Sequence, residues 1–205
     1  MKAKVGILDY GMGNILSIIN ALNYLNIKSE KITNYKKIDK FDFIILPGVG
    51  AFGEAMKNLK KKNFIEPLSN YVNNKNRYLV GICLGLQLIG QFSSEISYNK
   101  GLAFADFETK KFTVKKNFPI PHVGFNKVIF EKKNDLLKGI DDESYFYFTH
   151  SYRIKYRKNN FFLGYTNYIE NFLSLYVKEN IIAMQFHPEK SQINGLNLLK
   201  NIFKL

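Results

Sequence analysis

The stretch Tyr78–Gln87, which reads YLVGICLGLQ, decides the fold of this 205-residue chain. Its first part is a short apolar run typical of a buried β-strand, and its last part begins a segment in which apolar residues have helical spacing. Between these parts, Gly81 and Gly85 lie two positions on either side of Cys83, the single cysteine in the sequence. Glycines remove Cβ atoms where a sharp strand-to-helix turn is crowded, so the pattern predicts a nucleophile elbow with Cys83 at its apex.

The predicted elbow places the sulfur of Cys83 at the N-terminus of the next helix, which we expect over 84–92. Unpaired N–H groups and the positive end of the helix dipole favour a thiolate at such a position. A single cysteine is also often just a small buried apolar residue. The choice between these two interpretations depends on the rest of the chain.

Apolar segments alternate with segments of helical spacing through the first half of the chain. This alternation predicts a three-layer α/β fold, in which helices cover both faces of a mostly parallel central sheet. From Leu102 onward the pattern is typical of antiparallel strands, so we expect an antiparallel β extension with a kinked connection over 119–126. No linker divides residues 1–205, which we expect to form a single domain. The expected strands include 5–8, 27–32, 41–46, 78–82, 145–148, 161–165, 173–177 and 181–186, and the expected helices are 15–25, 52–61, 65–72, 84–92 and 194–203.

The composition is that of a soluble globular protein, with 46% hydrophobic and 23% charged residues. No apolar run approaches the ~18 residues of a membrane span, and the first residues show no signal-peptide pattern. One cysteine cannot form an internal disulfide, so we expect a cytoplasmic protein in a reducing compartment. The histidines His122, His150 and His187 have no second His or Cys at ligand spacing, so we expect no metal and no cofactor.

The formal net charge of +13 raises the question of a nucleic-acid partner, because polyanion binding is driven by the neutralisation of phosphates. The lysines are scattered over expected loops and helix faces, which favours a general compositional bias over a dedicated polyanion site. We therefore expect no nucleic-acid partner beyond weak, non-specific association, and no membrane partner.

A histidine and a glutamate lie two apart, just past the last expected strand, in His187-Pro188-Glu189. An extended backbone sends side chains i and i+2 to the same side, so Glu189 can hold the imidazole in one tautomer while its other nitrogen faces a thiol. This pair and Cys83 both follow strands of one expected sheet, and catalytic groups gather at the carboxyl ends of such strands. The pattern indicates a Cys-His-Glu triad, although H-P-E alone is short enough to occur by chance in a surface turn.

The loop Pro47–Gly50 closes another buried strand, and its glycines leave backbone N–H groups free to face a ligand. With this loop and the motifs above, the chain resembles the class I (triad) glutamine amidotransferases, and among them the glutaminase subunits of imidazole glycerol phosphate synthase. The resemblance rests on D-Y-G-M-G-N, P-G-V-G, G-I-C-L-G-L-Q, P-H-V-G-F-N, F-T-H-S-Y and F-H-P-E-K-S, in the expected order over nearly the whole chain. It implies a class I amidotransferase fold with flavodoxin-like topology.

The resemblance implies that the chain hydrolyses L-glutamine. Cys83 would attack the carboxamide, His187 would activate the thiol and protonate the leaving ammonia, and Glu189 would orient the imidazole. The oxyanion hole would consist of two backbone N–H groups, that of Leu84 and that of Val49 after its peptide reorients.

The resemblance also implies a set of substrate-binding residues made of two loop glycines and four side chains. The six residues are Gly48, Gly50, Gln87, Glu95, Ser151 and Tyr152. From the residue patterns alone we would favour a helix surface for Gln87 and Glu95, and strand-end packing for Ser151 and Tyr152.

Ammonia is useful only if it is kept from water and protons, so the resemblance implies a heterodimer with a (β/α)8-barrel synthase subunit. The leading hypothesis is ammonia supply for histidine biosynthesis. The family usually has tryptophan where this chain has Phe125, which motivates an alternative, a paralogous glutaminase that supplies a sugar-amidating synthase in surface-polysaccharide biosynthesis. A non-catalytic module with the same elbow is a further alternative. The positions that match the family's interface are Asn14, Phe125, Asn126 and Lys190.

Overall fold

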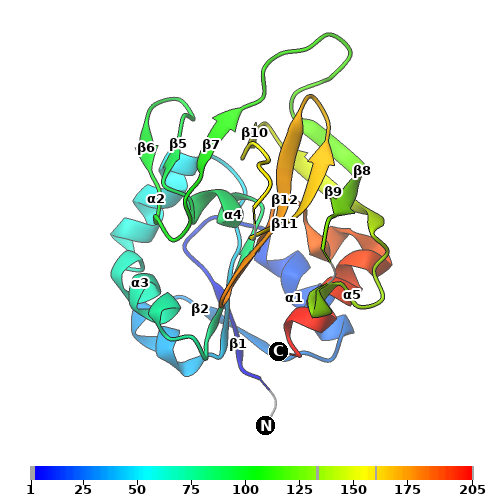
Figure 1. Cartoon of the computed structure of the whole chain (residues 1–205). Coiled ribbons are helices and arrows are strands. Elements are labelled where there is room, and N and C mark those ends of the chain that lie inside the picture. The colour runs from blue at the N-terminus through cyan, green and yellow to red at the C-terminus, as the bar shows by residue number, and fades with distance from the viewer. Residues whose placement is uncertain (1–2, 133, 160, 205) are drawn as a thin grey trace.

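Nine strands join into one mixed sheet within residues 3–132, 134–159 and 161–204, the part of the chain that the computed structural model describes. In Figure 1 this sheet runs between two layers of helices. The first five strands across the sheet are parallel, and antiparallel pairing begins after the fifth. In order they are β2 (Ser29–Ile32), β1 (Val5–Leu8), β3 (Phe43–Leu46), β4 (Tyr78–Ile82), β13 (Ile181–Met184), β12 (Asn171–Lys178), β11 (Phe162–Asn167), β8 (His122–Phe130) and β9 (Glu143–His150).

The inner parallel strands are apolar along their whole length because both of their faces are covered. Every residue of β1, β3 and β13 is buried. Successive side chains point to opposite faces, so Ile7 packs into one apolar core and Leu8 into the other. The parallel order, β2-β1-β3-β4-β13, confirms the expected flavodoxin-like topology.

Helices cover the two faces of the sheet as the sequence predicts. Figure 1 shows α1 (Ile15–Tyr24) and α5 (Gln192–Ile202) on one side, and α2 (Phe52–Lys61) and α3 (Ile65–Asn73) on the other. Leu22 and Leu198 belong to the core on the first side, and Leu59 and Leu68 to the core on the second. This arrangement confirms the three-layer α/β architecture.

The antiparallel extension lengthens the same sheet beyond β13, and four short strands form a smaller sheet beside it. The connection from the smaller sheet to β8 extends beyond the body of the molecule in Figure 1. No helix in the described part of the chain is long and apolar enough to cross a membrane. The smaller sheet has the order β10 (Tyr152–Arg153), β7 (Glu108–Lys111), β5 (Phe92–Ser93) and β6 (Asn99–Lys100).

Two expected boundaries differ from the structure by more than two residues. The helix after the elbow, α4 (Leu84–Leu88), is shorter than the expected 84–92, because the chain turns at Gly90 to pair with the backbone of Phe107, where an added Cβ would lie 2.7 Å from the Phe107 ring. The expected kinked connection over 119–126 is also shorter, because β8 already begins at His122 and pairs with β9.

Replacing Gly85 with alanine is expected to lower the free energy of unfolding by about 3 kcal/mol. The added Cβ would lie 2.0 Å from the carbonyl oxygen of Leu46, a backbone atom at the end of β3 that cannot move aside alone. Urea unfolding measures the loss. Gly53→Ala in α2 is the matched control, because its Cβ meets only the movable end of Asn99 at 2.9 Å, and alanine favours the helix by about 1 kcal/mol. Equal losses in the two variants would contradict the expected role of Gly85.

Candidate active site

Cys83 lies at the sharp turn between β4 and α4. Its backbone has φ +53° and ψ −106°, a conformation that costs a non-glycine residue about 1–3 kcal/mol. Its N–H donates to the carbonyl oxygen of Met184 at 2.8 Å, which ties the turn to the end of β13. The close packing of Gly85 against β3 leaves no room for a larger residue at the start of the helix. The structure therefore has the strained elbow that the G-x-C-x-G pattern predicts.

His187 follows β13 and is held by its backbone on both sides. Its N–H donates to the carbonyl oxygen of Tyr147 at 2.8 Å, and its carbonyl oxygen accepts from the hydroxyl of Ser191 at 2.6 Å. Its Nδ1 lies 2.8 Å from Oε1 of Glu189, and only 3% and 2% of the two side chains are exposed. The imidazole therefore has one orientation, with Nδ1 committed to the carboxylate.

The charges around His187 favour its protonated form. Burial lowers the pKa of His187, but interactions with the Cys83 side chain and the Glu189 carboxylate together raise it to about 10. Nε2 of the ring is buried and makes no well-formed hydrogen bond to the described part of the protein. The site thus suits an imidazolium at His187, whose second ring nitrogen remains available for proton transfer.

The loop after β3 closes over the elbow. The N–H of Leu84, one of the two predicted oxyanion donors, donates to the carbonyl oxygen of Gly48 at 3.4 Å. That carbonyl belongs to the same planar trans peptide as the N–H of Val49, so the N–H of Val49 points away from the elbow. One predicted donor is therefore occupied and the other is turned away, and a flip of this single peptide would free both.

A pocket of about 280 Å³ opens beside Cys83 and brings most of the predicted site residues together. Gly48 does not line it, and neither do His187 and Glu189, whose side chains are buried. The described residues contain no cluster of three or more metal-ligating side chains. The lining residues are Val49, Gly50, Cys83, Leu84, Gln87, Glu95, Pro121, Thr149, His150, Ser151 and Tyr152.

Two of the predicted substrate-binding side chains also have partners within the protein. Oε2 of Glu95 accepts from the N–H of Phe52 at 2.5 Å and so caps α2, whose own N-cap residue gives no side-chain bond. Nε2 of Gln87 donates to the carbonyl oxygen of Tyr152 at 3.1 Å and to Oε1 of Gln185 at 3.0 Å. Both side chains therefore help to build the pocket wall.

Sequence reasoning missed Gln185 as a site residue. This fully buried side chain donates from Nε2 to the sulfur of Cys83 at 3.7 Å, and the sulfur lies 3.9 Å from the carbonyl oxygen of Thr149. The only signal was its place two residues before His187, where the alternation of a strand gives it the same side as the histidine.

Three of the four residues predicted at the partner interface lie on or near β8 and β9. Phe125 is 46% exposed, and the centre of its ring lies 5.6 Å from that of the Tyr147 ring. Nζ of Lys190 lies 5.6 Å from the centre of the same Tyr147 ring. Asn126 is the next residue on β8. Asn14 lies at the start of α1, where its Oδ1 accepts from the N–H of Ser17 at 3.3 Å.

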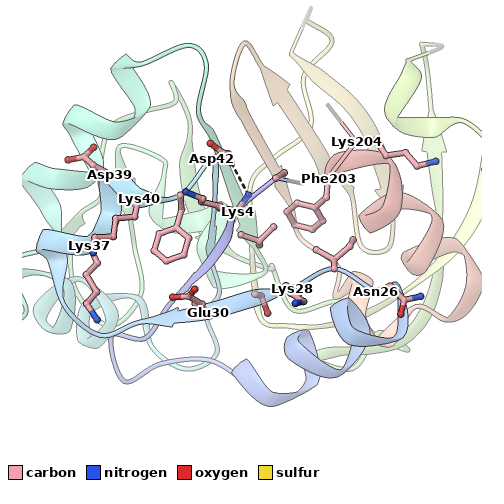
Figure 2. Close-up of a pocket in the computed structure, with 15 residues that line it drawn as sticks. Lys4, Asn26, Lys28, Glu30, Lys37, Asp39, Lys40, Asp42, Phe203 and Lys204 are labelled. Carbon is pink, nitrogen blue, oxygen red and sulfur yellow. Dashed lines mark hydrogen bonds between the residues drawn. The ribbon is translucent and has the colours of Figure 1, made fainter. Parts of the chain in front are cut away.

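A larger hollow, of about 1020 Å³, lies at the opposite edge of the sheet, beside the first residues of the parallel strands. Figure 2 shows charged side chains around it, with Lys37 and Lys204 at opposite ends. The lysines do not converge on one point, and Cys83 follows the other end of β4. This hollow is therefore separate from the candidate active site.

Acid is expected to destabilise the protein through two buried histidines. Burial lowers the pKa of His122 to about 4, and burial with the neighbouring His122 lowers that of His150 to about 3. Below the ordinary value of 6.5 the unfolded chain binds protons that the folded chain does not, so the free energy of unfolding falls from pH 6.5 to about 4. Urea unfolding across this range should show a shallower pH slope for His150→Phe than for wild type, and an equal slope would contradict the assignment.

The chain matches the family model described as "Glutamine amidotransferase class-I" over residues 6–205. Two solved structures share its fold at 14% identity and a TM-score of 0.75. One is described as a glutamine amidotransferase, and the match covers 98% of this chain and 99% of the chain in that structure. The other, PurLQS from Thermotoga maritima, covers 100% and 99%. The chain belongs to the class-I glutamine amidotransferase family and is an enzyme of that class.

Relatives with higher sequence identity show which group within the family this chain is similar to. Imidazole glycerol phosphate synthase subunit HisH of Aquifex aeolicus is 39% identical over 196 residues, which cover 95% of this chain and 93% of the relative. Subunit HisH 1 of Campylobacter jejuni (strain RM1221) is 40% identical over 201 residues, which cover 98% and 100%. Within the class-I family, this chain groups with the subunits named HisH.

Proposed function

We propose that this chain hydrolyses L-glutamine to glutamate and ammonia through a triad of Cys83, His187 and Glu189. The observation that carries the proposal is the buried His187–Glu189 pair at 2.8 Å. The side chain of Cys83, held in a strained elbow beside a pocket, acts electrostatically on the imidazole of this pair. Gly48 would act through its peptide bond to Val49. The residues that we expect to contact the substrate are Gly48, Gly50, Gln87, Glu95, Ser151 and Tyr152. No metal or cofactor takes part in this chemistry.

The reaction begins when the Cys83 thiolate attacks the carboxamide carbon of glutamine. The carbon–nitrogen bond breaks while the imidazolium of His187 gives its proton to the leaving ammonia, and Glu189 keeps the ring oriented. Neutral His187 then takes a proton from water, whose oxygen attacks the thioester and releases glutamate. The sulfur leaves as the thiolate, and His187 is again imidazolium.

The oxyanion of each tetrahedral intermediate needs both backbone donors. Leu84 N–H is occupied by Gly48 and the N–H of Val49 is turned away, so the isolated chain is expected to hydrolyse glutamine slowly. A docked partner that stabilises the flipped peptide would raise kcat, because each donor is worth about 3 kcal/mol. Stopped assays of glutamate release, with and without the partner, test this expectation. Full activity of the isolated chain would contradict it.

The partner that we propose is a (β/α)8-barrel synthase, with which this chain forms a heterodimer that makes imidazole glycerol phosphate and aminoimidazole carboxamide ribotide in histidine biosynthesis. The printed names of the relatives support a subunit of imidazole glycerol phosphate synthase. We place the interface at Asn14, Phe125, Asn126 and Lys190, where the exposed ring of Phe125 packs against the Tyr147 ring that Lys190 also contacts. We further propose that residues 1–205 form a single domain and that the heterodimer is cytoplasmic.

The experiment that tests the pathway is co-purification with the synthase. Capture of a barrel synthase that makes imidazole glycerol phosphate, together with histidine auxotrophy on deletion, would support histidine biosynthesis. Capture of a sugar-amidating synthase without auxotrophy would instead support the alternative, for which Phe125 in place of tryptophan is the motivating observation.

A further inference from the structure

A continuous run of hydrogen bonds leads from Asn126 on β8 to the carbonyl oxygen of Tyr152 in the pocket wall. Nδ2 of Asn126 lies 3.1 Å from Nε2 of His122, and Nδ1 of His122 lies 3.1 Å from Nε2 of His150. Nδ1 of His150 lies 2.8 Å from the carbonyl oxygen of Tyr152. The two imidazoles are buried and face each other across the register pair His122–His150 of β8 and β9.

The two ends of this run determine where every proton lies. A carbonyl oxygen only accepts, so Nδ1 of His150 carries a proton and donates to Tyr152. Burial keeps His150 neutral, so its Nε2 accepts, and Nδ1 of His122 must donate to it. Neutral His122 then accepts at Nε2 from the amide of Asn126. All three bonds donate in one direction, from the surface of β8 toward the pocket.

The amide of Asn126 is anchored in the orientation that this direction requires. Its Oδ1 accepts from the N–H of Lys127 at 2.7 Å, so Nδ2 is the atom that faces His122. Nδ2 also donates to the carbonyl oxygen of Asn167 at 3.3 Å. Gly124, between Asn126 and His122, has φ +125°, a backbone conformation that residues with a side chain rarely adopt.

The run continues beyond Tyr152 to the nucleophile. The carbonyl oxygen of Tyr152 also accepts from Nε2 of Gln87, and Gln87 donates to Gln185. Gln185 in turn donates to the sulfur of Cys83 at 3.7 Å. Gln87 and Gln185 are buried, so each of these amides depends on its protein partners for hydrogen bonds.

We propose that Asn126, His122 and His150 are positioning residues that hold the Tyr152 carbonyl, and through Gln87 and Gln185 the Cys83 sulfur, in place for attack on glutamine. This proposal rests on the glutaminase function proposed above and deepens it. Asn126 is half-buried beside the exposed Phe125 on the expected interface, so a synthase that contacts Asn126 contacts the first donor of the chain.

The histidines also pack as rings, and a test must separate packing from hydrogen bonding. The ring of His122 stacks on Tyr168 at 4.0 Å and on Phe148 at 5.0 Å. His122→Phe keeps an aromatic ring for this stacking but removes both hydrogen bonds. His122→Gln loses the ring but keeps the direction of the chain, because its amide N–H can donate to His150 and its oxygen can accept from Asn126.

The test measures glutamine hydrolysis by the complex with the synthase. We expect His122→Phe to lower kcat about tenfold with little change in KM, because the nucleophile is misplaced rather than the substrate released. His122→Gln should retain most of the wild-type kcat. Lys127→Ala is the matched control and should equal wild type, because it keeps the backbone N–H that anchors Asn126 and removes only a side chain that pairs with Glu143 outside the chain of bonds. Wild-type kcat in His122→Phe, or a larger loss in His122→Gln than in His122→Phe, would overturn the proposal.

A second measurement is independent of activity. Nitrogen-15 NMR of the imidazole rings in the wild-type chain should show both His122 and His150 as neutral tautomers protonated at Nδ1. An Nε2-protonated His150 would overturn the proposed direction. If the tautomers are as expected but the wild-type complex releases no glutamate, the proposed function fails and the hydrogen-bond chain stands. If wild type is active and His122→Phe is equally active, the positioning role fails alone.

Discussion

Replacing Cys83 with alanine is expected to abolish glutamine hydrolysis, with kcat/KM at least ~10³-fold below wild type. Alanine removes the only atom of this chain that can form the thioester, since the sequence has no other cysteine. The oxyanion donors and the pocket would remain, so glutamine should still bind. Glutamate release and isothermal titration with glutamine, both in the presence of the synthase, measure the two effects. If Cys83→Ala lost glutamine binding as well as activity, the result would point to a structural rather than a nucleophilic role for Cys83.

Cys83→Gly separates the strain of the elbow from its chemistry. The φ of +53° at Cys83 is costly for alanine but not for glycine. Both variants should therefore be inactive, while urea unfolding should show Cys83→Gly to be more stable than Cys83→Ala by about 1 kcal/mol. Equal stability would mean that the elbow stores no strain.

Replacing Glu189 with glutamine is expected to lower kcat by about 10²- to 10⁴-fold and to leave KM little changed. The substitution keeps the shape of the side chain but removes the charge that helps to raise the pKa of His187. The new amide N–H₂ would also lie where Oε2 of Glu189 is now, a buried position with no hydrogen-bond partner among the described residues. Initial rates over a range of glutamine concentrations measure the kcat and KM effects separately.

The pH profile of Glu189→Gln gives a sharper comparison than its rate alone. Because the carboxylate raises the pKa of His187, its loss should lower that pKa, and the imidazolium should give up its proton at a lower pH than in wild type. The alkaline limb of kcat against pH should therefore move toward neutral pH. Glu179→Gln is a suitable control, because Glu179 is exposed and pairs with Lys75 far from the pocket residues. An unchanged alkaline limb in Glu189→Gln would contradict the role of Glu189.

The parallel half of the fold was predictable because it depends on local patterns. The continuous apolar runs of β1, β3 and β13 identify strands buried on both faces, and the glycines around Cys83 mark a turn in which an added Cβ has no room. The end of α4 was not predictable, because it is set by the packing of Gly90 against Phe107 from a distant segment.

The candidate site shows the same division. The placement of Cys83, His187 and Glu189 could be predicted because each lies just past the end of a buried strand, and such ends meet at one edge of the sheet. Their roles in a triad remain a proposal. The His122–His150 contact depends on the register of β8 against β9, which no short pattern specifies. The orientation of the peptide between Gly48 and Val49 is a single torsional choice, and it is equally invisible in the sequence.

The central claim is that Cys83 is the nucleophile that attacks glutamine. The most direct measurement is mass spectrometry of the intact chain after incubation, in complex with the synthase, with a diazoketone analogue of glutamine. The diazo carbon of the analogue takes up a proton, and the sulfur then attacks this carbon and displaces molecular nitrogen, which leaves a stable carbon–sulfur bond. We therefore predict one adduct per chain, located on the peptide that contains Cys83 and suppressed by excess glutamine. No adduct, or an adduct on another residue that glutamine does not suppress, would contradict the assignment.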